Sequence, residues 1–392
     1  SGGVSGTPRT LQTNASPLTL WSNSDATGTG AIYLDQYSAL NSAGGAITAT
    51  ATGGAITLAG GADANSDGIP DGNALAPATA GVPGISLGRS FNTALAHSAL
   101  TNLASSIKVY AGTSTLTARG ESTLGPGIWV GPGTSVLTGG KQTFVGVESG
   151  NSAGSAATYG HGILFGYSSS TVAFDLTSAA TSGIAIDIQG STTRTGGSEF
   201  GVNFNQSTTG PGTIVASGGG DIKVSGTAGV TTNSGVYVKY TQLLAANGSI
   251  NVDSNTSLST NNAYFGAKSG SAVTSDTGAV TLTADAVDLS SGYVNTSGIV
   301  SVLPKTASAE IDLGTETASK LSLTSTELGN ITAGTLRIGD GNNSGNITVS
   351  ANLSPSNFST FALRTAGAVS GTGAVTIALP EDVQAEVIDV PA

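Results

Sequence analysis

The acidic segment between Asp63 and Asp71 holds the side chains of this chain that are best placed to do chemistry together. Its sequence, Asp63-Ala-Asn65-Ser-Asp67-Gly-Ile69-Pro-Asp71, matches the pattern D-x-[DN]-x-[DN]-G that opens many calcium-binding loops. Three carboxylates this close in sequence repel one another unless a cation lies between them. The segment therefore predicts a structural calcium ion, bound by the side chains of Asp63, Asn65, Asp67 and Asp71 and by the backbone carbonyl of Ile69.

The loop departs from an EF-hand, because its twelfth position is Ala74 rather than a bidentate glutamate. Its spacing resembles the D-x-N-x-D-G-x-x-D loops of thrombospondin type 3 and related extracellular repeats. The alternative is a solvated turn in which aspartate and asparagine side chains bond to their own backbone. The segment Asp340-Gly-Asn342-Asn-Ser344 has similar spacing but one carboxylate, and we interpret it as such a turn.

Neither of the two histidines stands in a catalytic pattern. The tripeptide Gly160-His161-Gly162 resembles a short motif of pectin-cleaving β-helix hydrolases. Glycoside cleavage needs two carboxylates beside the scissile bond, however, and the chain has no Asp-Asp pair and only isolated arginines. His97 has no acidic residue within ten positions. The chain also lacks a hydrolase triad, a P-loop and a dinucleotide fingerprint. We therefore predict that the protein is not an enzyme and has neither catalytic nor cofactor-binding residues.

A short unit recurs along the chain and must build the scaffold on which any site stands. In each copy a glycine and a small or polar residue precede alternating β-branched and polar residues, the period-2 pattern of a strand buried on one face. The copies include Gly30-Ala-Ile-Tyr-Leu, Gly45-Ala-Ile-Thr-Ala, Gly54-Ala-Ile-Thr-Leu, Gly220-Asp-Ile-Lys-Val, Gly248-Ser-Ile-Asn-Val, Gly278-Ala-Val-Thr-Leu, Gly345-Asn-Ile-Thr-Val and Gly373-Ala-Val-Thr-Ile. Turn-plus-strand units without helices between them are typical of a β-solenoid.

The composition fits a thin, stacked core. The chain of 392 residues has 58 Gly and 9% charged residues, and low charge suits a stack in which identical positions lie one above another. The chain has no Cys, which excludes disulfides, thiol catalysis and thiolate metal sites. Its formal net charge of −11 makes nucleic acid an unfavourable partner. No apolar run is long enough to predict a transmembrane segment.

We expect one elongated domain over residues 1–392, with coils of about 20 residues and irregular loops. Residues 61–84 are predicted as a loop insertion that carries the candidate calcium site. Residues 90–107 fit a short helix or a polar coil equally well. Residues 379–392 are acidic and lack glycine, which indicates a C-terminal cap or a linker. No Met or signal peptide precedes Ser1, so we expect a segment of a longer, processed or truncated polypeptide.

Several units resemble the repeats of filamentous-haemagglutinin-like bacterial surface adhesins. They include Gly-Ala-Ile-Thr-Leu-Ala (54–59), Leu-Ser-Leu-Thr-Ser-Thr (321–326) and Gly-Asn-Ile-Thr-Ala-Gly-Thr-Leu-Arg-Ile-Gly (329–339). The resemblance covers most of the chain and implies an all-β fold, a right-handed parallel β-helix. It also implies a bacterial protein that is secreted or displayed at the cell surface. The Asn-Pro-Asn signature of that family's amino-terminal secretion domain is missing, so the resemblance points to the repetitive passenger segment.

From these observations we expect an extracellular structural or adhesive protein, either a surface adhesin segment or a fibre-forming subunit. Because solenoid ends expose unpaired strand edges, self-association into fibres or a surface layer is expected. Glycans of a host or a neighbouring cell are candidate partners. Two alternatives stay open: a polysaccharide-active β-helix enzyme, either a lyase or a hydrolase, and a carbohydrate-binding module. For the last, Trp21, Trp129 and the tyrosines could form a sugar-stacking platform, although packing at coil ends also accounts for them.

Overall fold

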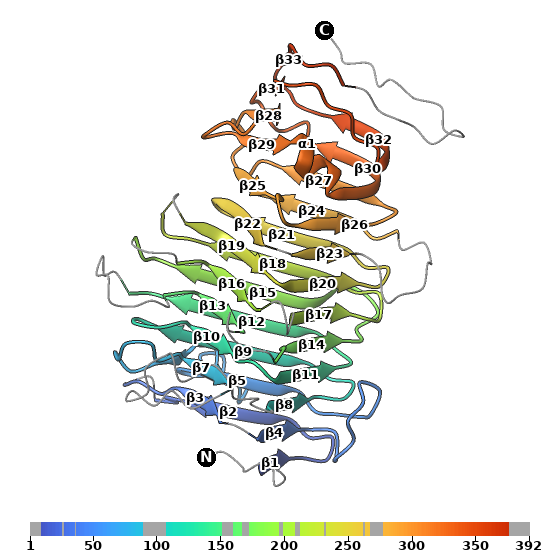
Figure 1. Ribbon diagram of the computed structural model, residues 1–392. Helices are drawn as coiled ribbons and strands as arrows, with labels where there is room; N and C mark the ends of the chain where they lie inside the picture. Colours follow the sequence, from blue (N-terminus) through green and yellow to red (C-terminus); the bar gives the residue numbers. More distant parts are fainter. Residues whose placement is uncertain are drawn as a thin grey trace.

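The computed structural model describes residues 9–25, 27–35, 37–88, 107–150, 160–166, 172–195, 199–207, 212–230, 233–261, 263–266 and 277–375. These residues are nearly all β, and their parallel strands stack coil upon coil from the amino-terminal to the carboxy-terminal end (Figure 1). The architecture is a parallel β-helix, as the recurring turn-plus-strand unit predicts. In the described part of the chain, no helix is long and apolar enough to cross a membrane.

Each coil visits three sheets in turn, which we number in the order in which the chain enters them. Sheet 1 contains β1 (Arg9–Gln12), β4 (Ser38–Asn41), β8 (Ile107–Tyr110), β11 (Thr134–Thr138), β14 (Asp175–Ser178), β17 (Gly212–Ala216), β20 (Thr241–Ala245), β23 (Tyr264–Gly266), β26 (Tyr293–Asn295) and the first part of β30 (Ile331–Ile338).

Sheet 2 contains β2 (Leu18–Ser22), β5 (Ile56–Gly60), β6 (Ala74–Leu75), β9 (Leu116–Ser122), β12 (Gln142–Glu148), β15 (Ile184–Thr192), β18 (Asp221–Thr227), β21 (Ile250–Ser254), β24 (Val280–Thr283), β27 (Ile299–Leu303), the second part of β30 and β32 (Phe358–Leu363). Sheet 3 contains β3 (Ile32–Leu34), β7 (Ile85–Leu87), β10 (Ile128–Val130), β13 (Ile163–Phe165), β16 (Val202–Asn205), β19 (Ser234–Lys239), β22 (Ser257–Asn261) and β25 (Ala286–Asp288).

The core is a set of apolar ladders that run along the stack. In sheet 1, Leu40, Val109 and Val136 occupy consecutive rungs in register and are buried. The same ladder continues through Leu176, Ile214, Leu243, Phe265 and Val294. Residues between these positions face outward, so each strand alternates between a buried and a more exposed side chain. The period-2 pattern of the sequence is thus the pattern of inward and outward side chains in the coils.

Two facing ladders of glycine line the corner between sheets 2 and 3. Four glycines lie in register on successive rungs of sheet 2, and four others directly precede or open the sheet 3 strands of the same coils. The facing pairs are Gly120 and Gly127, Gly146 and Gly162, Gly190 and Gly201, and Gly226 and Gly235. A Cβ atom on the first member of any pair would collide with the carbonyl oxygen of the second. The close approach of the two sheets therefore depends on the missing side chains.

The last coils depart from the simple order. A fourth sheet stacks β29 (Leu321–Thr324), β28 (Ile311–Gly314), β31 (Ile347–Val349) and β33 (Val369–Gly371), so β28 lies between β29 and β31 although it precedes both in the chain. After β29 the chain forms the short helix α1 (Ser325–Gly329). Thr324 and Glu327 form a capping box, because the Thr324 amide donates to Glu327 Oε2 at 2.8 Å and the Glu327 amide donates to Thr324 Oγ1 at 3.3 Å.

Several expectations about organisation need revision. Coil length varies more than expected, since the register pairs Val280 with Val300, which agrees with about 20 residues, but also pairs Ile56 with Leu116 and Leu40 with Val109 in a much longer coil. The loop predicted over residues 61–84 contains β6, which pairs with β9. The repeat unit at residues 321–326 is not one strand, because α1 begins inside it. The segments 90–106 and 379–392 lie outside the described residues.

Replacing Gly190 by alanine is predicted to destabilise the stack, because the new Cβ collides with backbone rather than with a flexible side chain. Overpacking of this kind typically costs about 1–3 kcal/mol, and chemical denaturation measures it. The matched control is Gly329→Ala in α1, where a Cβ meets no atom within 4 Å and alanine favours the helix. Equal stability of the Gly190→Ala variant and the unaltered protein would contradict the role assigned to the glycine ladders.

Candidate functional site

The acidic loop lies between β5 and β6, and its side chains fold onto the loop backbone. Asp63 Oδ2 accepts a hydrogen bond from the Gly68 amide at 2.7 Å, and Asp71 Oδ2 accepts one from the Ala64 amide at 2.8 Å. Gly68 has a φ of 82°, which only glycine adopts without strain. Asp63 and Asp71 thus close the two ends of the loop around its centre.

The other predicted ligands lie on the same turn. Asn65 Oδ1 accepts from the Asp67 amide at 3.0 Å, and Asp67 Oδ1 accepts from the Ile69 amide at 2.8 Å. Across the described residues, no three histidine, aspartate or glutamate side chains are gathered closely enough to hold a metal ion by themselves. The amide oxygen of Asn65 and the carbonyl of Ile69 would have to complete a site here, as calcium loops allow. Calcium binding by this loop stays a prediction.

The two tryptophans have different surroundings. Trp21 is 37% exposed, and its Nε1 donates to the carbonyl of Gly61 at 2.7 Å, so it pins the start of the acidic loop. Trp129 is 2% exposed and lies on the outer side of sheet 3. A buried ring cannot stack on a sugar, so Trp129 is excluded from the sugar-stacking platform considered from the sequence.

A buried ionic cluster joins two coils near the corner of sheets 2 and 3. Arg194 Nε lies 2.7 Å from Glu148 Oε1, and both side chains are essentially inaccessible to solvent. Thr192 donates to the second oxygen of Glu148 at 2.9 Å, and Arg194 also donates to the carbonyl of Thr123 at 3.0 Å. Glu199 lies 3.7 Å from the same guanidinium. One buried arginine therefore contacts two acidic side chains. We interpret the cluster as a structural ion pair.

His161 lies beside this cluster and is also buried. Its Nδ1 accepts from the Phe200 amide at 3.1 Å, and its Nε2 lies 3.0 Å from Nδ2 of Asn203. The ring stacks on Phe200, which in turn stacks on Tyr237. Gly162, the last residue of the Gly160-His161-Gly162 motif, belongs to the glycine ladder. The motif is thus part of the packing of the corner.

Burial shifts the proton affinities of two groups here in opposite senses. Loss of hydration raises the pKa of Glu199 to about 7, with the Arg194 charge opposing the shift and the Glu148 charge adding to it. Loss of hydration lowers the pKa of His161 to about 3. Both groups are therefore largely uncharged in the folded protein at slightly acidic pH.

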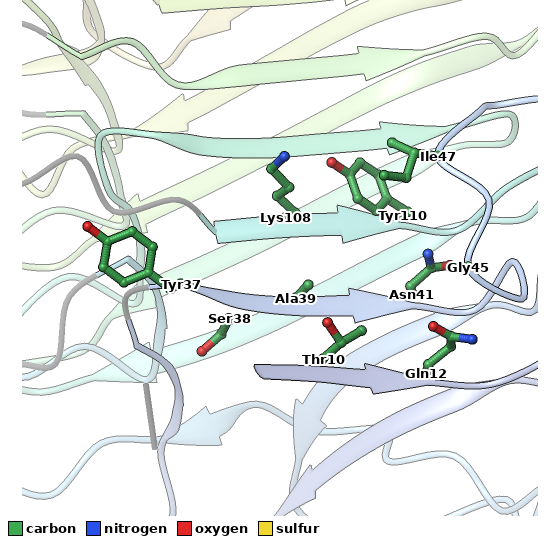
Figure 2. Close-up of a pocket in the computed structure, with 10 residues that line it drawn as sticks. All are labelled: Thr10, Gln12, Tyr37, Ser38, Ala39, Asn41, Gly45, Ile47, Lys108 and Tyr110. Carbon is green, nitrogen blue, oxygen red and sulfur yellow. The ribbon is translucent and has the colours of Figure 1, made fainter. Parts of the chain in front are cut away.

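A hollow on the outer face of sheet 1 is large enough to hold a small ligand. Its volume is about 430 Å³. Its floor is formed by the first three strands of sheet 1, which are β1, β4 and β8. Figure 2 shows Thr10 and Gln12 on β1, Ala39 on β4, and Lys108 and Tyr110 on β8. Strand register places Thr10, Ala39 and Lys108 side by side across the floor. The hollow arises where the small Ala39 side chain stands between two longer ones.

The two ends of the hollow are walled by apolar side chains. Tyr37 stands at one end, and Ile47, from the loop after β4, stands beside Tyr110 at the other (Figure 2). Asn41 holds that loop in place, since its Nδ2 donates to the carbonyl of Ala46 at 3.2 Å and its Oδ1 accepts from the Ala43 amide at 2.8 Å. The loop that carries Ile47 is therefore held in place by hydrogen bonds within the protein and needs no ligand to adopt this position.

The sequence did not indicate this hollow. Its lining residues come from three strands that are far apart in the chain, and only the register brings them together. The one local signal is Tyr37, a non-glycine residue at a φ of 55°, where the chain turns sharply into β4. The unit starting at Gly45 was interpreted as a strand, but residues 45–49 lie in no strand, and Gly45 and Ile47 line the hollow.

Removing Glu199 or His161 by mutation is predicted to give variants whose stability changes with pH in opposite directions. Glu199 has a higher pKa in the folded protein than its usual 4.5, so its contribution falls as pH rises from 4.5 to about 7. His161 has a lower pKa than its usual 6.5, so its contribution falls as pH drops from 6.5 to about 3. In the Glu199→Gln variant, which keeps His161, the free energy of unfolding should rise as pH increases from 4.5 to 6.5. In the His161→Asn variant, which keeps Glu199, it should fall over the same range. Urea denaturation across pH 4–8 measures both, and identical profiles for the two variants would disprove these assignments.

Comparison of the chain with protein-family models, with curated protein sequences and with solved structures finds no match in any of the three.

Proposed function

We propose that the protein is an extracellular structural or adhesive β-solenoid, either a segment of a bacterial surface adhesin or a subunit of a fibre. The observation that carries this proposal is the open amino-terminal end of the core ladder. Leu11 pairs with Leu40 in register and continues the inward ladder of sheet 1, yet it is 53% exposed. Among the described strands, β1 pairs only with β4.

The opposite end of the stack has a matching edge. All residues of β33 are exposed, and among the described strands it pairs only with β31. A parallel strand added to either edge would continue the hydrogen-bond ladder and cover apolar surface. End-to-end contact between copies, or continuation into further coils of a longer chain, meets this requirement. Either arrangement would give a long, stiff rod, which suits the extracellular role that we propose.

Assembly is predicted to depend on Leu11. Replacing it by lysine puts a charge on the open end of the ladder and removes roughly 1 kcal/mol of apolar burial, about a fivefold weaker association. Because Leu11 is exposed, the fold should tolerate the change. The control is Ile299→Lys, at a side chain of the lateral surface that is 37% exposed. Sedimentation and electron microscopy measure the assembly. A monomeric unaltered protein, or fibres formed equally well by Leu11→Lys, would overturn the fibre proposal.

Calcium binding by the acidic loop is the second part of the proposal. A bound cation would relieve the repulsion among Asp63, Asp67 and Asp71, and the Trp21 contact at Gly61 would connect the stiffened loop to β2. This role is structural, as in other extracellular modules with calcium dissociation constants of about 10⁻⁴–10⁻³ M.

Calcium is predicted to stabilise the protein through this loop alone. At 10 mM calcium, a dissociation constant of roughly 10⁻³ M corresponds to about 1.4 kcal/mol. The gain should disappear in Asp67→Ala and persist in Asp340→Asn, which alters the single-carboxylate turn whose Asp340 accepts from the Asn342 amide. Calorimetry and thermal denaturation measure the effect. No heat of binding at millimolar calcium would refute the calcium proposal and leave the fibre proposal standing.

A further inference from the structure

The hollow on sheet 1 has the dimensions of a site for a short, linear ligand. Its volume of about 430 Å³ falls in the range of small-molecule sites, about 300–1,000 Å³. Tyr37 stands four residues before Asn41, and Asn41 lies in register with Tyr110. The two tyrosines are therefore separated along the strands by about 13 Å, from a rise of about 3.3 Å per residue. Two linked sugar rings would fill this length.

The lining alternates apolar and hydrogen-bonding groups in a way that suits a sugar. The aromatic and aliphatic side chains at the two ends, Tyr37 at one and Tyr110 with Ile47 at the other, offer surfaces for C–H groups (Figure 2). Between them, Thr10 and Gln12 present a hydroxyl and an amide that can bond to ligand hydroxyls. A purely apolar ligand would leave these polar groups without partners, so a polyhydroxylated ligand fits better.

The positive charge of Lys108 favours an anionic sugar over a neutral one. Among the described lining residues, Lys108 is the only one with a charged side chain, and it lies on β8, on one side of Ala39 (Figure 2). Ion pairs in the described part of the chain involve Lys141, Arg194, Lys305 and Lys320, and Lys108 is not among them. The positive charge of Lys108 is therefore not neutralised by a carboxylate within 4 Å in the described structure. In a chain with a net charge of −11, this exposed positive group at the side of the hollow favours an anionic ligand.

We infer that the hollow binds a short glycan that carries a carboxylate, a uronate disaccharide unit, with Lys108 paired to the carboxylate and the sugar rings lying between Tyr37 and Tyr110. The hydroxyl and amide of Thr10 and Gln12 fix the orientation of the rings. Ala39 provides the depth, and the loop held by Asn41 provides the end wall. This inference deepens the adhesive part of the proposed function and rests on it, since it names the class of glycan that is bound.

The test measures binding of digalacturonate and of its dimethyl ester to the intact chain by calorimetry at low salt. The ester has the same rings without the charges, so it should bind at least about fivefold more weakly. Lys108→Met should weaken digalacturonate binding by a similar factor and abolish the difference between the two ligands. Ala39→Leu, which fills the floor of the hollow, should abolish binding of both.

The control variant is Gln242→Leu, on the same outward row of sheet 1 but several coils away. It should bind digalacturonate as the unaltered protein does. Circular dichroism confirms that each variant is folded, and Lys108→Met provides the test if Ala39→Leu is not. Equal affinity for acid and ester, binding unaffected by both hollow variants, or no binding of either ligand would overturn the inference. Fibre assembly and its dependence on Leu11 are measured separately, so the failure of one proposal is distinguishable from that of the other.

Discussion

Parallel, in-register stacking at about 4.8 Å per rung is the constraint on which the rest of this structure depends. Each side chain lies directly above its counterpart in the next coil. The residue types at one position must therefore be compatible with close contact between neighbouring coils. Apolar residues satisfy this condition by forming the ladder from Leu40 to Val294. Glycine satisfies it at the corner of sheets 2 and 3, where any Cβ would strike the facing backbone. Rows of like charge would fail it, which explains why charged residues are so few.

Two groups of charged residues lie where the stacking of strands is interrupted. The Arg194 cluster lies where strands β12 and β15 end, and the single buried guanidinium contacts both Glu148 and Glu199. Breaking such a pair leaves an uncompensated buried charge, which typically costs 3–5 kcal/mol. The acidic loop likewise leaves the body of the solenoid between β5 and β6. Both features belong to the connections between strands, which also carry most of the variation in coil length.

Sequence patterns predicted the parallel β-helix because the alternation of apolar and polar residues is local and is repeated in almost every coil. The helix α1 was missed although its capping box, Thr324 and Glu327, stands in the sequence. A five-residue helix is too short to produce helical periodicity, and the preceding strand has the same composition as the repeats. The glycine ladders were visible only as frequent glycines, since the pairing of Gly190 with Gly201 requires both register and the angle between two sheets.

The sequence alone determined the strand pattern and the acidic loop, because each depends on residues adjacent in the chain. Asp63 and Gly68, for example, are five residues apart and bonded to one another. Only the tertiary structure determined the hollow on sheet 1. Thr10, Ala39 and Lys108 are separated by dozens of residues and become neighbours through register, which in turn depends on the unequal lengths of the connecting loops. Those loops have no periodicity, so nothing in the local sequence states how many residues each coil will take.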